Sequence, residues 1–566
     1  MSKMWKGVET PLVKGNLVSF LFKDAHKWNH LHALECGYTR QSLTYWELQQ
    51  AVGRWGAWLT SFMGESNPSA ANPSAANPST ANPPCRQSFV VGKLAPSCVD
   101  VAVVQLGTMA AGVVYTSLNI SFGPRELSAQ IEETGAALLI TTPKFALRLQ
   151  EALDKLGRKI PVVLIGSGEL GDVGSDLNVV GIYKDIINDQ TIKPMEPVEL
   201  LGDEVALLVY TSGTTGMPKS VQQSHNSIIA GVTASIHPHF WVHPPTINES
   251  NQTRSLLIRD IGLAFGLICA FMPGVATGMC HVVKTLDDNT FLQDVEEFKI
   301  NTIAIVPLNF PTLLRLSRER QDLLKYFRHV IVSGGPIPQA HVTAVASTMP
   351  GVFVQKCYGA SEMFVIAQDP VGGGKPGFTG SVCPNVELKL KDLNSTELLP
   401  ANQMGILYVK SPCKMQGYRN NLTATNDVID EEGWYNSGDV ALVDEDGYVQ
   451  IVDRFKEIIK MADGCNAAPA ELENTILEME GVKEVSVIGT PDASTGFDSI
   501  YVFIVNKTDV SPPIKEEDVV NYVVRNLNEL KRPRKVVFLD ALPRNDNEKV
   551  DRKLLRLKAK EMEKEK

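Results

Sequence analysis

The chain has 566 residues, of which 44% are hydrophobic and 21% charged, a composition typical of an ordinary globular protein. Its formal charge of -10 argues against a nucleic-acid-binding role, because an acidic surface repels phosphate backbones. Nine cysteines without a CxxC pair indicate scattered reduced thiols rather than a disulfide framework or a zinc site.

The N-terminal sequence MSKMWKGVET lacks the apolar centre of a signal peptide. No uncharged apolar stretch reaches the roughly 18 residues of a membrane span. The C-terminal KEK differs from the serine-lysine-leucine address of peroxisomal proteins. We therefore expect a cytoplasmic protein without a transmembrane segment, and we leave open peroxisomal or peripheral membrane association. Oligomeric state does not follow from the sequence.

An unusual insert follows the first helical segment. Residues 67–84 read NPSAANPSAANPSTANPP, a five-residue repeat of proline and small residues. Such a composition cannot bury a core, so we expect a disordered surface loop over residues 65–85. The repeat carries no aromatic or charged residue, which favours a neutral expansion over a protein-binding tract.

After the insert, strand-like apolar runs alternate with helical patterns. The expected strands cover residues 90–95, 113–118, 137–142 and 161–166, and the intervening helices cover residues 99–111 and begin near Gly123 and Pro143. This alternation predicts βαβ units and parallel sheets, and hence an α/β fold.

The segment VYTSGTTGMPKS, residues 209–220, follows the apolar run VALLVY and is built to hold phosphates. Gly213 and Gly216 let the backbone turn tightly and bring its N–H groups toward an anion. Hydroxyl donors and one cation accompany them: Thr211, Ser212, Thr214, Thr215 and Lys219. The spacing differs from that of a Walker loop, so the sequence predicts another kind of phosphate loop.

Five further motifs follow in order along the chain. They are SGG at residues 333–335, YGASE at 358–362, YNSGD ending in Asp439, DRFKEIIK at 453–460, and LPRNDNEKVDRKLLR, which contains Lys549. Together with the phosphate loop they closely resemble the signatures of the adenylate-forming superfamily, which includes acyl-CoA synthetases, 4-coumarate CoA ligases, luciferases and peptide-synthetase adenylation domains. The resemblance covers almost the whole chain.

The resemblance implies a large N-terminal domain of residues 1–452, with parallel-rich sheets flanked by helices and a β-barrel-like subdomain. A small, mobile C-terminal α+β domain of residues 453–566 would follow, pivoting about Asp453. Rotation about this hinge would separate two half-reactions by exchanging Lys549 for the region of Gly464 at the active site.

Residue roles are also implied by the resemblance. Lys549, Glu362 and Thr211 would be catalytic, Glu362 would hold Mg²⁺, and Gly464 would line the CoA channel. Arg259, Asp260 and Met363 would line the acyl pocket. The ATP-binding set would be Thr211, Ser212, Gly213, Thr214, Thr215, Gly216, Lys219, Gly334, Gly335, Tyr358, Gly359, Ser361, Asp439 and Arg454.

Three positions depart from the family pattern. Ser361 replaces the commoner threonine, Glu548 replaces the glycine that usually precedes the catalytic lysine, and MADGCNAAPAELE is one residue longer than usual. An adjacent carboxylate such as Glu548 partly neutralises a lysine. Glu548 and the longer hinge segment motivate a non-catalytic alternative.

We therefore expect an ATP-dependent ligase that activates a fatty or phenylpropanoid-like carboxylic acid through an acyl-adenylate to a CoA thioester, with Mg²⁺ as cofactor. Three alternatives stay open: an amino-acid-type adenylating enzyme, a luciferase-like oxygenase, and a non-catalytic ATP-binding homologue. Acyl-chain length and aromatic preference do not follow from the sequence.

Overall fold

The computed structural model describes residues 4–66, 83–166, 176–211, 219–246, 248–335, 337, 339–461, 466–491, 498–507, 513–527, 529–545 and 549–564. The expected disorder of the repeat insert, the centre of the phosphate loop, Gly464 and Glu548 fall outside these residues. No helix in the described ranges is both long and apolar enough to cross a membrane.

An eight-stranded sheet contains the predicted βαβ units, and its strand order is β20-β10-β9-β5-β4-β6-β7-β8. Its strands are β4 (Val90–Leu94), β5 (Val114–Ser117), β6 (Ala136–Thr141), β7 (Val162–Leu164), β8 (Val179–Ile182), β9 (Val205–Thr211), β10 (Lys219–Ser224) and β20 (Gly417–Tyr418). The accompanying helices are α2 (Tyr45–Ser66), α3 (Pro83–Ser88), α4 (Val99–Ala110), α5 (Pro124–Thr134), α6 (Pro143–Leu156) and α7 (Tyr183–Asn188).

The predicted alternation is confirmed within a residue or two at each boundary. Strands β5, β4, β6 and β7 run parallel, as their helical crossovers require. Every residue of α4 is buried, which explains why its sequence is apolar on all sides. Helices α5 and α6 begin with Pro124 and Pro143, whose fixed φ favours the first helical position.

A fourteen-stranded mixed sheet forms the rest of the large domain, in the order β1-β18-β19-β21-β22-β17-β16-β15-β14-β13-β11-β12-β2-β3. Its strands are β1 (Trp5–Lys6), β2 (His32–Cys36), β3 (Ser42–Thr44), β11 (Arg254–Leu257), β12 (Cys280–Val283), β13 (Thr302–Ile305), β14 (His329–Val332), β15 (Phe353–Ala360), β16 (Phe364–Gln368), β17 (Gly380–Val382), β18 (Glu387–Lys391), β19 (Met404–Lys410), β21 (Tyr435–Val443) and β22 (Tyr448–Arg454). In the order of the sheet, the strands from β1 through β16 pair antiparallel with their neighbours.

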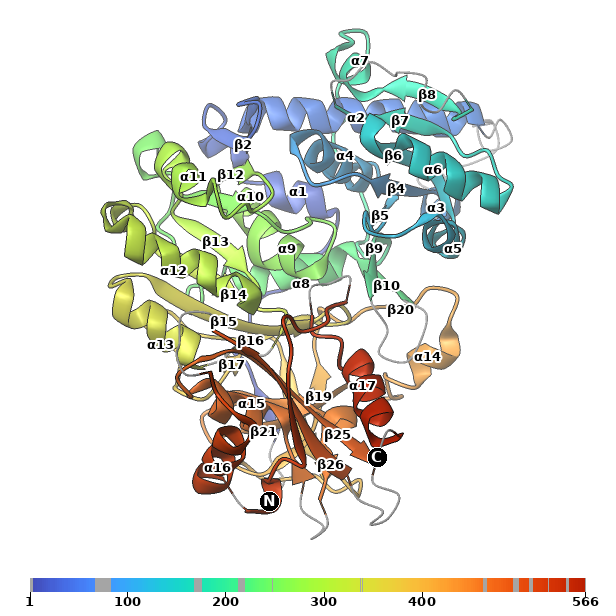
Figure 1. The fold of residues 1–566 in the computed structure, drawn as a ribbon. Helices are drawn as coiled ribbons and strands as arrows, with labels where there is room; N and C mark the ends of the chain where they lie inside the picture. The colour runs from blue at the N-terminus through green and yellow to red at the C-terminus, as the bar shows by residue number, and fades with distance from the viewer. Residues whose placement is uncertain are drawn as a thin grey trace.

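Helices cover this sheet as an α/β fold requires (Figure 1). They are α1 (Leu17–Phe22), α8 (His225–Ser235), α9 (Ala264–Gly266), α10 (Met272–Thr277), α11 (Phe291–Phe298), α12 (Phe310–Glu319) and α13 (Gln339–Thr348). Helix α14 (Leu422–Asn426) instead adjoins β20 of the eight-stranded sheet. Between α9 and α10 lies a π-helical turn, η6 (Leu267–Phe271). Strand β15 joins the parallel and antiparallel parts, because it runs parallel to β14 and antiparallel to β16.

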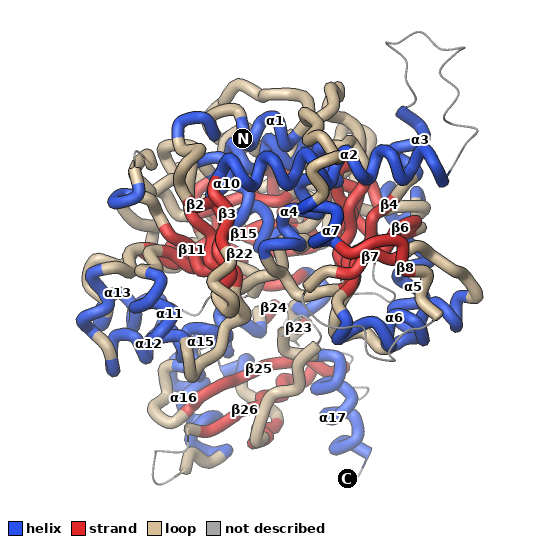
Figure 2. Tube along the Cα trace, turned by 90° about the horizontal axis from the view of Figure 1, so that it is seen from above, coloured by secondary structure: helices blue, strands red, loops and turns tan. Residues whose placement is uncertain are grey.

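The small C-terminal domain lies on one side of the large domain in both views (Figure 1; Figure 2). It contains β23 (Ile459–Lys460), β24 (Asn466–Ala467), β25 (Val482–Pro491), β26 (Asp498–Asn506), β27 (Lys535–Phe538), α15 (Pro469–Leu477), α16 (Glu516–Asn526) and α17 (Arg552–Lys564). The large and small domains together confirm the predicted architecture. The boundary between residues 452 and 453 stays a prediction.

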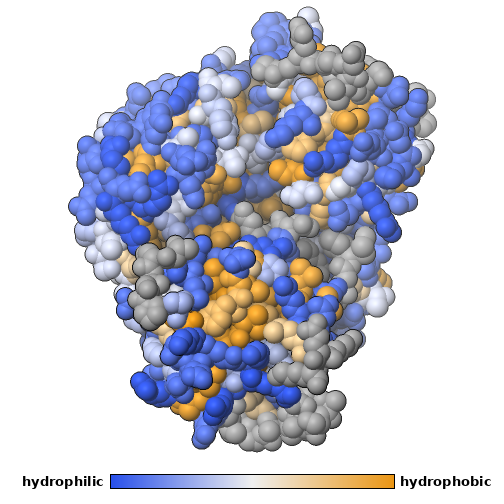
Figure 3. All heavy atoms as spheres, in the orientation of Figure 1, coloured by the Kyte–Doolittle hydropathy of each residue, from blue (hydrophilic) through white to orange (hydrophobic). Residues whose placement is uncertain are grey.

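The C-terminal helix packs against the small domain with one face. In α17, Leu555 and Ala559 are fully buried against Ile488, Tyr501 and Phe503 of the small sheet. Leu555 and Ala559 are four residues apart and therefore lie on the same face of the helix, which explains this packing. Figure 3 shows a hydrophobic area in the lower half of the molecule, where Figure 1 places β25 and β26.

Candidate active site

The two ends of the phosphate loop meet at the start of a hairpin. Thr211 is the last residue of β9, Lys219 is the first of β10, and the two are Cα partners. The Thr211 hydroxyl donates to the Lys219 carbonyl oxygen at 3.3 Å. Because this hairpin closes the loop, Thr211 and Lys219 stand on either side of the predicted phosphate site. Residues 212–218, and with them Ser212 to Gly216, lie outside the described residues.

Tyr418 brings Lys219 and Glu362 together. Its hydroxyl donates a 2.7 Å hydrogen bond to Glu362 Oε1, and the Lys219 ammonium lies 4.8 Å from the centre of its ring. Strand β20 places Tyr418 beside β10, with Val221 as its Cα partner. Burial raises the pKa of Tyr418, and the Glu362 charge raises it further, so the phenol stays a donor at neutral pH.

A carboxylate, a guanidinium and a phenol meet at Asp439. Arg454 Nε lies 2.8 Å from Asp439 Oδ1, and the Tyr358 hydroxyl donates to Oδ2. Asp439 and Arg454 are Cα partners across β21 and β22, which fixes their approach. Burial raises the pKa of Asp439, whereas Arg454 opposes the shift. Each carboxylate oxygen has a second lone pair, so two further hydroxyl donors still find acceptors.

Backbone geometry explains two of the predicted glycines. Gly334 has a φ of +87°, in the left-handed region that favours glycine. At Gly359, an added Cβ would lie 1.9 Å from the carbonyl oxygen of Phe364, because β16 passes directly beside it. Gly335 directly follows Gly334 in the same predicted turn. In the YGASE segment, the Ser361 carbonyl accepts a 2.7 Å hydrogen bond from the Gln223 side chain. The predicted turn and YGASE segments thus adjoin the ends of β14 and β15.

Lys549 reaches this region from the small domain. Its surface is exposed, yet the surrounding protein lowers its pKa, first by desolvation and then through the charges of Arg454 and Arg259, while Asp439 opposes the shift. Two hydrogen bonds join its backbone to Asn545, since Lys549 N–H donates to Asn545 Oδ1 at 3.1 Å and Asn545 N–H donates to the Lys549 carbonyl at 2.8 Å.

The predicted hinge residue, Asp453, is tied to the small domain on both carboxylate oxygens. Oδ2 accepts from the Ala470 N–H at 3.1 Å, and Arg552 lies 3.2 Å from Oδ1. Arg552 also pairs with the partly buried Glu473 at 2.8 Å. Asp453 therefore connects β22 with the first turns of both α15 and α17.

The predicted acyl-pocket residues have different environments. Asp260 Oδ2 lies 2.8 Å from the ammonium of Lys93, a fully buried lysine in β4, and Oδ1 accepts from the Gly262 N–H at 2.8 Å. Met363 is fully buried in the main core. Only Arg259 is placed near Lys549, through its effect on that pKa. A direct contact of these three side chains with an acyl group stays a prediction.

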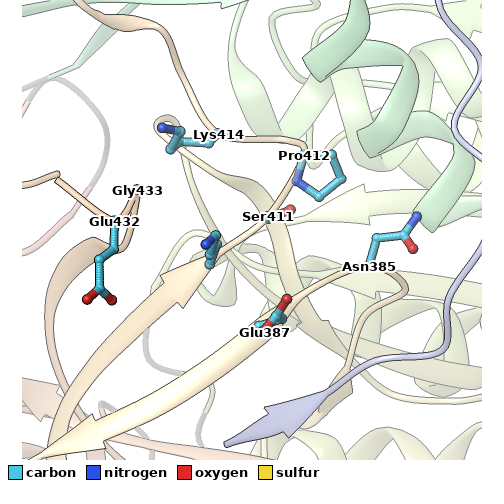
Figure 4. A pocket seen from close by; sticks show the side chains of 8 residues that line it. Asn385, Glu387, Ser411, Pro412, Lys414, Glu432 and Gly433 are labelled. Carbon is cyan, nitrogen blue, oxygen red and sulfur yellow. The ribbon is translucent and has the colours of Figure 1, made fainter. Parts of the chain in front are cut away.

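One cavity of about 330 Å³ opens beside the outer part of the antiparallel sheet (Figure 4). Asn385, Glu387, Lys410, Lys414 and Glu432 are among its lining residues. None of the predicted site residues lines it, so it is distinct from the region around Asp439.

Sequence reasoning missed Tyr418, Arg552 and Lys93. Neither Tyr418 nor Arg552 stands in a distinctive pattern, because each acts through a partner far along the chain. Lys93 did carry a signal, since a lysine within the apolar strand VVGKL must find a buried acidic partner.

Family models match most of the chain. The model described as AMP-binding enzyme matches residues 85–419, and the one described as AMP-binding enzyme C-terminal domain matches residues 471–549. The protein 4-coumarate–CoA ligase-like 1 of Arabidopsis thaliana is 30% identical over 483 residues, covering 83% of this chain and 84% of the relative. Peroxisomal OPC-8:0-CoA ligase 1 of the same plant is 29% identical over 479 residues, covering 83% of each.

Solved structures share the fold. ATP-bound MatB from Rhodopseudomonas palustris has a TM-score of 0.80 at 23% identity, covering 97% of this chain and 99% of that chain. The anthranilate CoA ligase AuaEII in complex with anthranoyl-AMP also has a TM-score of 0.80, at 21% identity, covering 97% and 98%.

Proposed function

Because this chain belongs to the AMP-binding enzyme family, whose relatives here are acid–CoA ligases, we propose that it activates a carboxylic acid with ATP and transfers the acyl group to CoA. One observation carries the proposal. Lys549 of the small domain lies close enough to Asp439 and Arg454 of the large domain for their charges to shift its pKa. A cation is thus held beside the predicted nucleotide site.

The first half-reaction needs positive charge because it joins two anions. The acid carboxylate attacks the α-phosphate of ATP, which gives an acyl-adenylate and pyrophosphate. Lys549 would stabilise the charge on the attacking oxygen and the α-phosphate, while Lys219 would attract the β and γ phosphates. Asp439 would accept hydrogen bonds from both ribose hydroxyls, and Arg454 would hold its carboxylate in place.

Glu362 is the residue that would hold Mg²⁺. Its Oε1 accepts from Tyr418, whereas Oε2 accepts no hydrogen bond within the described part of the chain. Those same residues contain no group of three or more histidine, cysteine, aspartate or glutamate side chains that could hold a metal. One carboxylate fits Mg²⁺, which takes its other ligands from water and substrate phosphates. When bound, the ion would neutralise phosphate charge.

The second half-reaction transfers the acyl group from AMP to the CoA thiol. We propose that the small domain rotates about Asp453 between the two steps, which removes Lys549 from the site. The Asp453 contacts with Ala470 and Arg552 would then move with the small domain. Gly464 would line the CoA channel in the second arrangement.

For the acid, we propose a fatty or phenylpropanoid-like substrate. The relatives named above support this class, since their names refer to 4-coumarate and to OPC-8:0. The pairing of Asp260 with Lys93 disfavours an amino-acid substrate, because this carboxylate already has a cationic partner and a free ammonium would compete with it. A cytoplasmic location remains our expectation, and a fluorescent fusion would test it against the peroxisome.

The proposal is tested by supplying ATP, Mg²⁺ and CoA with a panel of fatty, hydroxycinnamic, dicarboxylic and amino acids, and by detecting thioesters by mass. We expect a thioester from one fatty or aromatic class together with AMP and pyrophosphate. Adenylate without thioester would favour another acceptor, and light emission with a luciferin would favour the oxygenase. ATP binding without pyrophosphate release from any acid would support a non-catalytic homologue.

A further inference from the structure

Two cysteines that are 88 positions apart in the chain meet beside the predicted nucleotide site. Cys269 Sγ and Cys357 Sγ are 3.6 Å apart. Cys269 lies in the π-helical turn η6 and is partly exposed, whereas Cys357 lies in β15 and is buried. Cys357 directly precedes Tyr358, whose hydroxyl donates to Asp439.

The pair is distinct among the thiols that the structure describes. The other described cysteines are Cys36, Cys98, Cys280, Cys383 and Cys413, and none of these has a thiol contact of this kind. A disulfide has an S–S length of about 2.05 Å, so the two sulfur atoms need to approach by roughly 1.5 Å. Closing this gap requires rotation of the two cysteine side chains and a small adjustment of the backbone.

We propose that Cys269 and Cys357 form an oxidative modification site, at which peroxide converts the two thiols into a disulfide. The partly exposed Cys269 is the thiol that peroxide reaches. The buried Cys357 has no route to solvent of its own, but it lies in contact with the sulfur that is oxidised first. Cys269 thus acts as the peroxide-reactive cysteine, and Cys357 acts as the resolving cysteine that closes the disulfide.

The chemistry balances with hydrogen peroxide as the oxidant. Cys269 sulfur attacks one peroxide oxygen, so that an S–O bond forms, the O–O bond breaks, and hydroxide leaves with the thiol proton as water. Cys357 sulfur then attacks Cys269 sulfur, the S–S bond forms, the S–O bond breaks, and the second oxygen leaves as water with the Cys357 proton. Two thiols are oxidised by two electrons, and one peroxide is reduced to two waters.

The contact and burial also affect the rate of the second step. The hydrogen bond between Cys357 and Cys269 raises the pKa of the Cys357 thiol well above its usual value, and burial raises it further. Only the thiolate form attacks. We therefore expect disulfide formation to take minutes rather than milliseconds at neutral pH.

The disulfide would act on the nucleotide site through β15. Pulling Cys357 toward η6 displaces the strand segment that carries Tyr358, and a misplacement of about 1 Å at such a site costs up to a hundredfold in rate. This consequence rests on the proposed function, whereas formation of the cross-link does not. We expect ATP to bind the oxidised protein at least tenfold more weakly.

The test treats the full chain with hydrogen peroxide, blocks remaining thiols and maps peptides by mass. We expect a cross-linked peptide pair containing Cys269 and Cys357, lighter by two hydrogens and restored by dithiothreitol. It should be absent from Cys269→Ala and from Cys357→Ala, and present in Cys36→Ala, a matched control at another partly exposed cysteine. Both Cys269→Ala and Cys357→Ala are made, so that the test still stands if one of these variants fails to fold.

Other results would overturn the inference. If peroxide oxidises Cys36 while Cys269 and Cys357 both stay reduced, or if Cys269 accumulates as sulfinic acid without a cross-link, the site does not exist. An unchanged ATP dissociation constant in the cross-linked protein would overturn its link to the nucleotide site.

Discussion

Arg454 and Asp439 form an ion pair with 2.8 Å between Nε and Oδ1, directly beside the predicted hinge at Asp453. The two residues are opposite each other in the β21–β22 ladder, so the sheet itself sets their geometry. Tyr358 donates to the same carboxylate from β15. The contacts proposed for ribose and the pivot proposed for domain rotation therefore lie side by side on the neighbouring strands β21 and β22.

Replacing Asp439 tests the ribose-binding role. In Asp439→Asn, the Arg454 charge loses its partner and the diol loses an anionic acceptor, so we expect kcat/KM for ATP to fall by about a hundredfold or more. Tyr358→Phe removes one hydrogen bond to a charged group and should cost about tenfold. The measurement is acid-dependent pyrophosphate release at varied ATP. Similar kcat/KM values for ATP in wild type and Asp439→Asn would contradict this role.

Lys549 should make adenylation sensitive to alkaline pH. The pKa of Lys549 lies below that of an ordinary lysine, so as pH rises its ammonium is lost at a lower pH than that of an ordinary lysine. We expect adenylation to fall on the alkaline side, and Lys549→Arg to extend activity to higher pH, because guanidinium stays charged. Lys553→Arg, at an exposed position of α17, is the matched control. If adenylation falls at the same alkaline pH in wild type and in Lys549→Arg, the role assigned to Lys549 is refuted.

The buried pair of Lys93 and Asp260 should matter for stability. Their exposed side-chain fractions are 0% and 26%, and the pair joins β4 of one sheet to the loop after β11 of the other. We expect Lys93→Met to lower the free energy of unfolding by about 3 kcal/mol, because it leaves Asp260 without its cation. Lys93→Met combined with Asp260→Asn should recover part of that loss. Urea denaturation provides the measurement.

A surface pair provides the control for this comparison. Lys27 and Asp24 are 2.6 Å apart but largely exposed, so Lys27→Met should change stability by less than about 1 kcal/mol. Equal effects of Lys93→Met and Lys27→Met would show that the buried pair has no special role.

His329 should make the fold sensitive to acid. Burial lowers its pKa from 6.5 to about 4, and its ring lies between His243 at 3.0 Å and Gln355 at 3.1 Å. His329 is neutral in the native protein. As pH falls below 6.5, the histidine of the unfolded chain therefore binds a proton before that of the native protein does. By linkage this group alone destabilises the fold by about 2 kcal/mol between about pH 7.5 and about pH 5. In His329→Asn, the difference between urea midpoints at these two pH values should shrink, and an unchanged difference would contradict the prediction.

Local sequence patterns predicted the strands and helices of the eight-stranded sheet well, because alternating apolar runs and helix-starting prolines act over short distances. Lys219 and Asp439 were found because they stand in short motifs, and their roles remain proposals. Long-range pairing was harder. Asp260 was expected at an acyl group, yet it meets Lys93, which lies 167 positions earlier.

Other long-range contacts follow the same logic. No local pattern indicates that Tyr418 contacts both Lys219 and Glu362, since the contact depends on β20 joining the edge of β10. Charged residues dominate the composition of the C-terminal helix, yet Leu555 and Ala559 on one face are enough to dock it on the small sheet.

The most direct test of the central claim is acid-dependent exchange of labelled pyrophosphate into ATP, which isolates the first half-reaction, in wild type, Lys549→Ala and Lys553→Ala. We predict exchange with one class of acid in wild type and in Lys553→Ala, and a loss of at least about a hundredfold in Lys549→Ala. Exchange that persists undiminished in Lys549→Ala, or that is absent from wild type with every acid although ATP binds, would contradict the account.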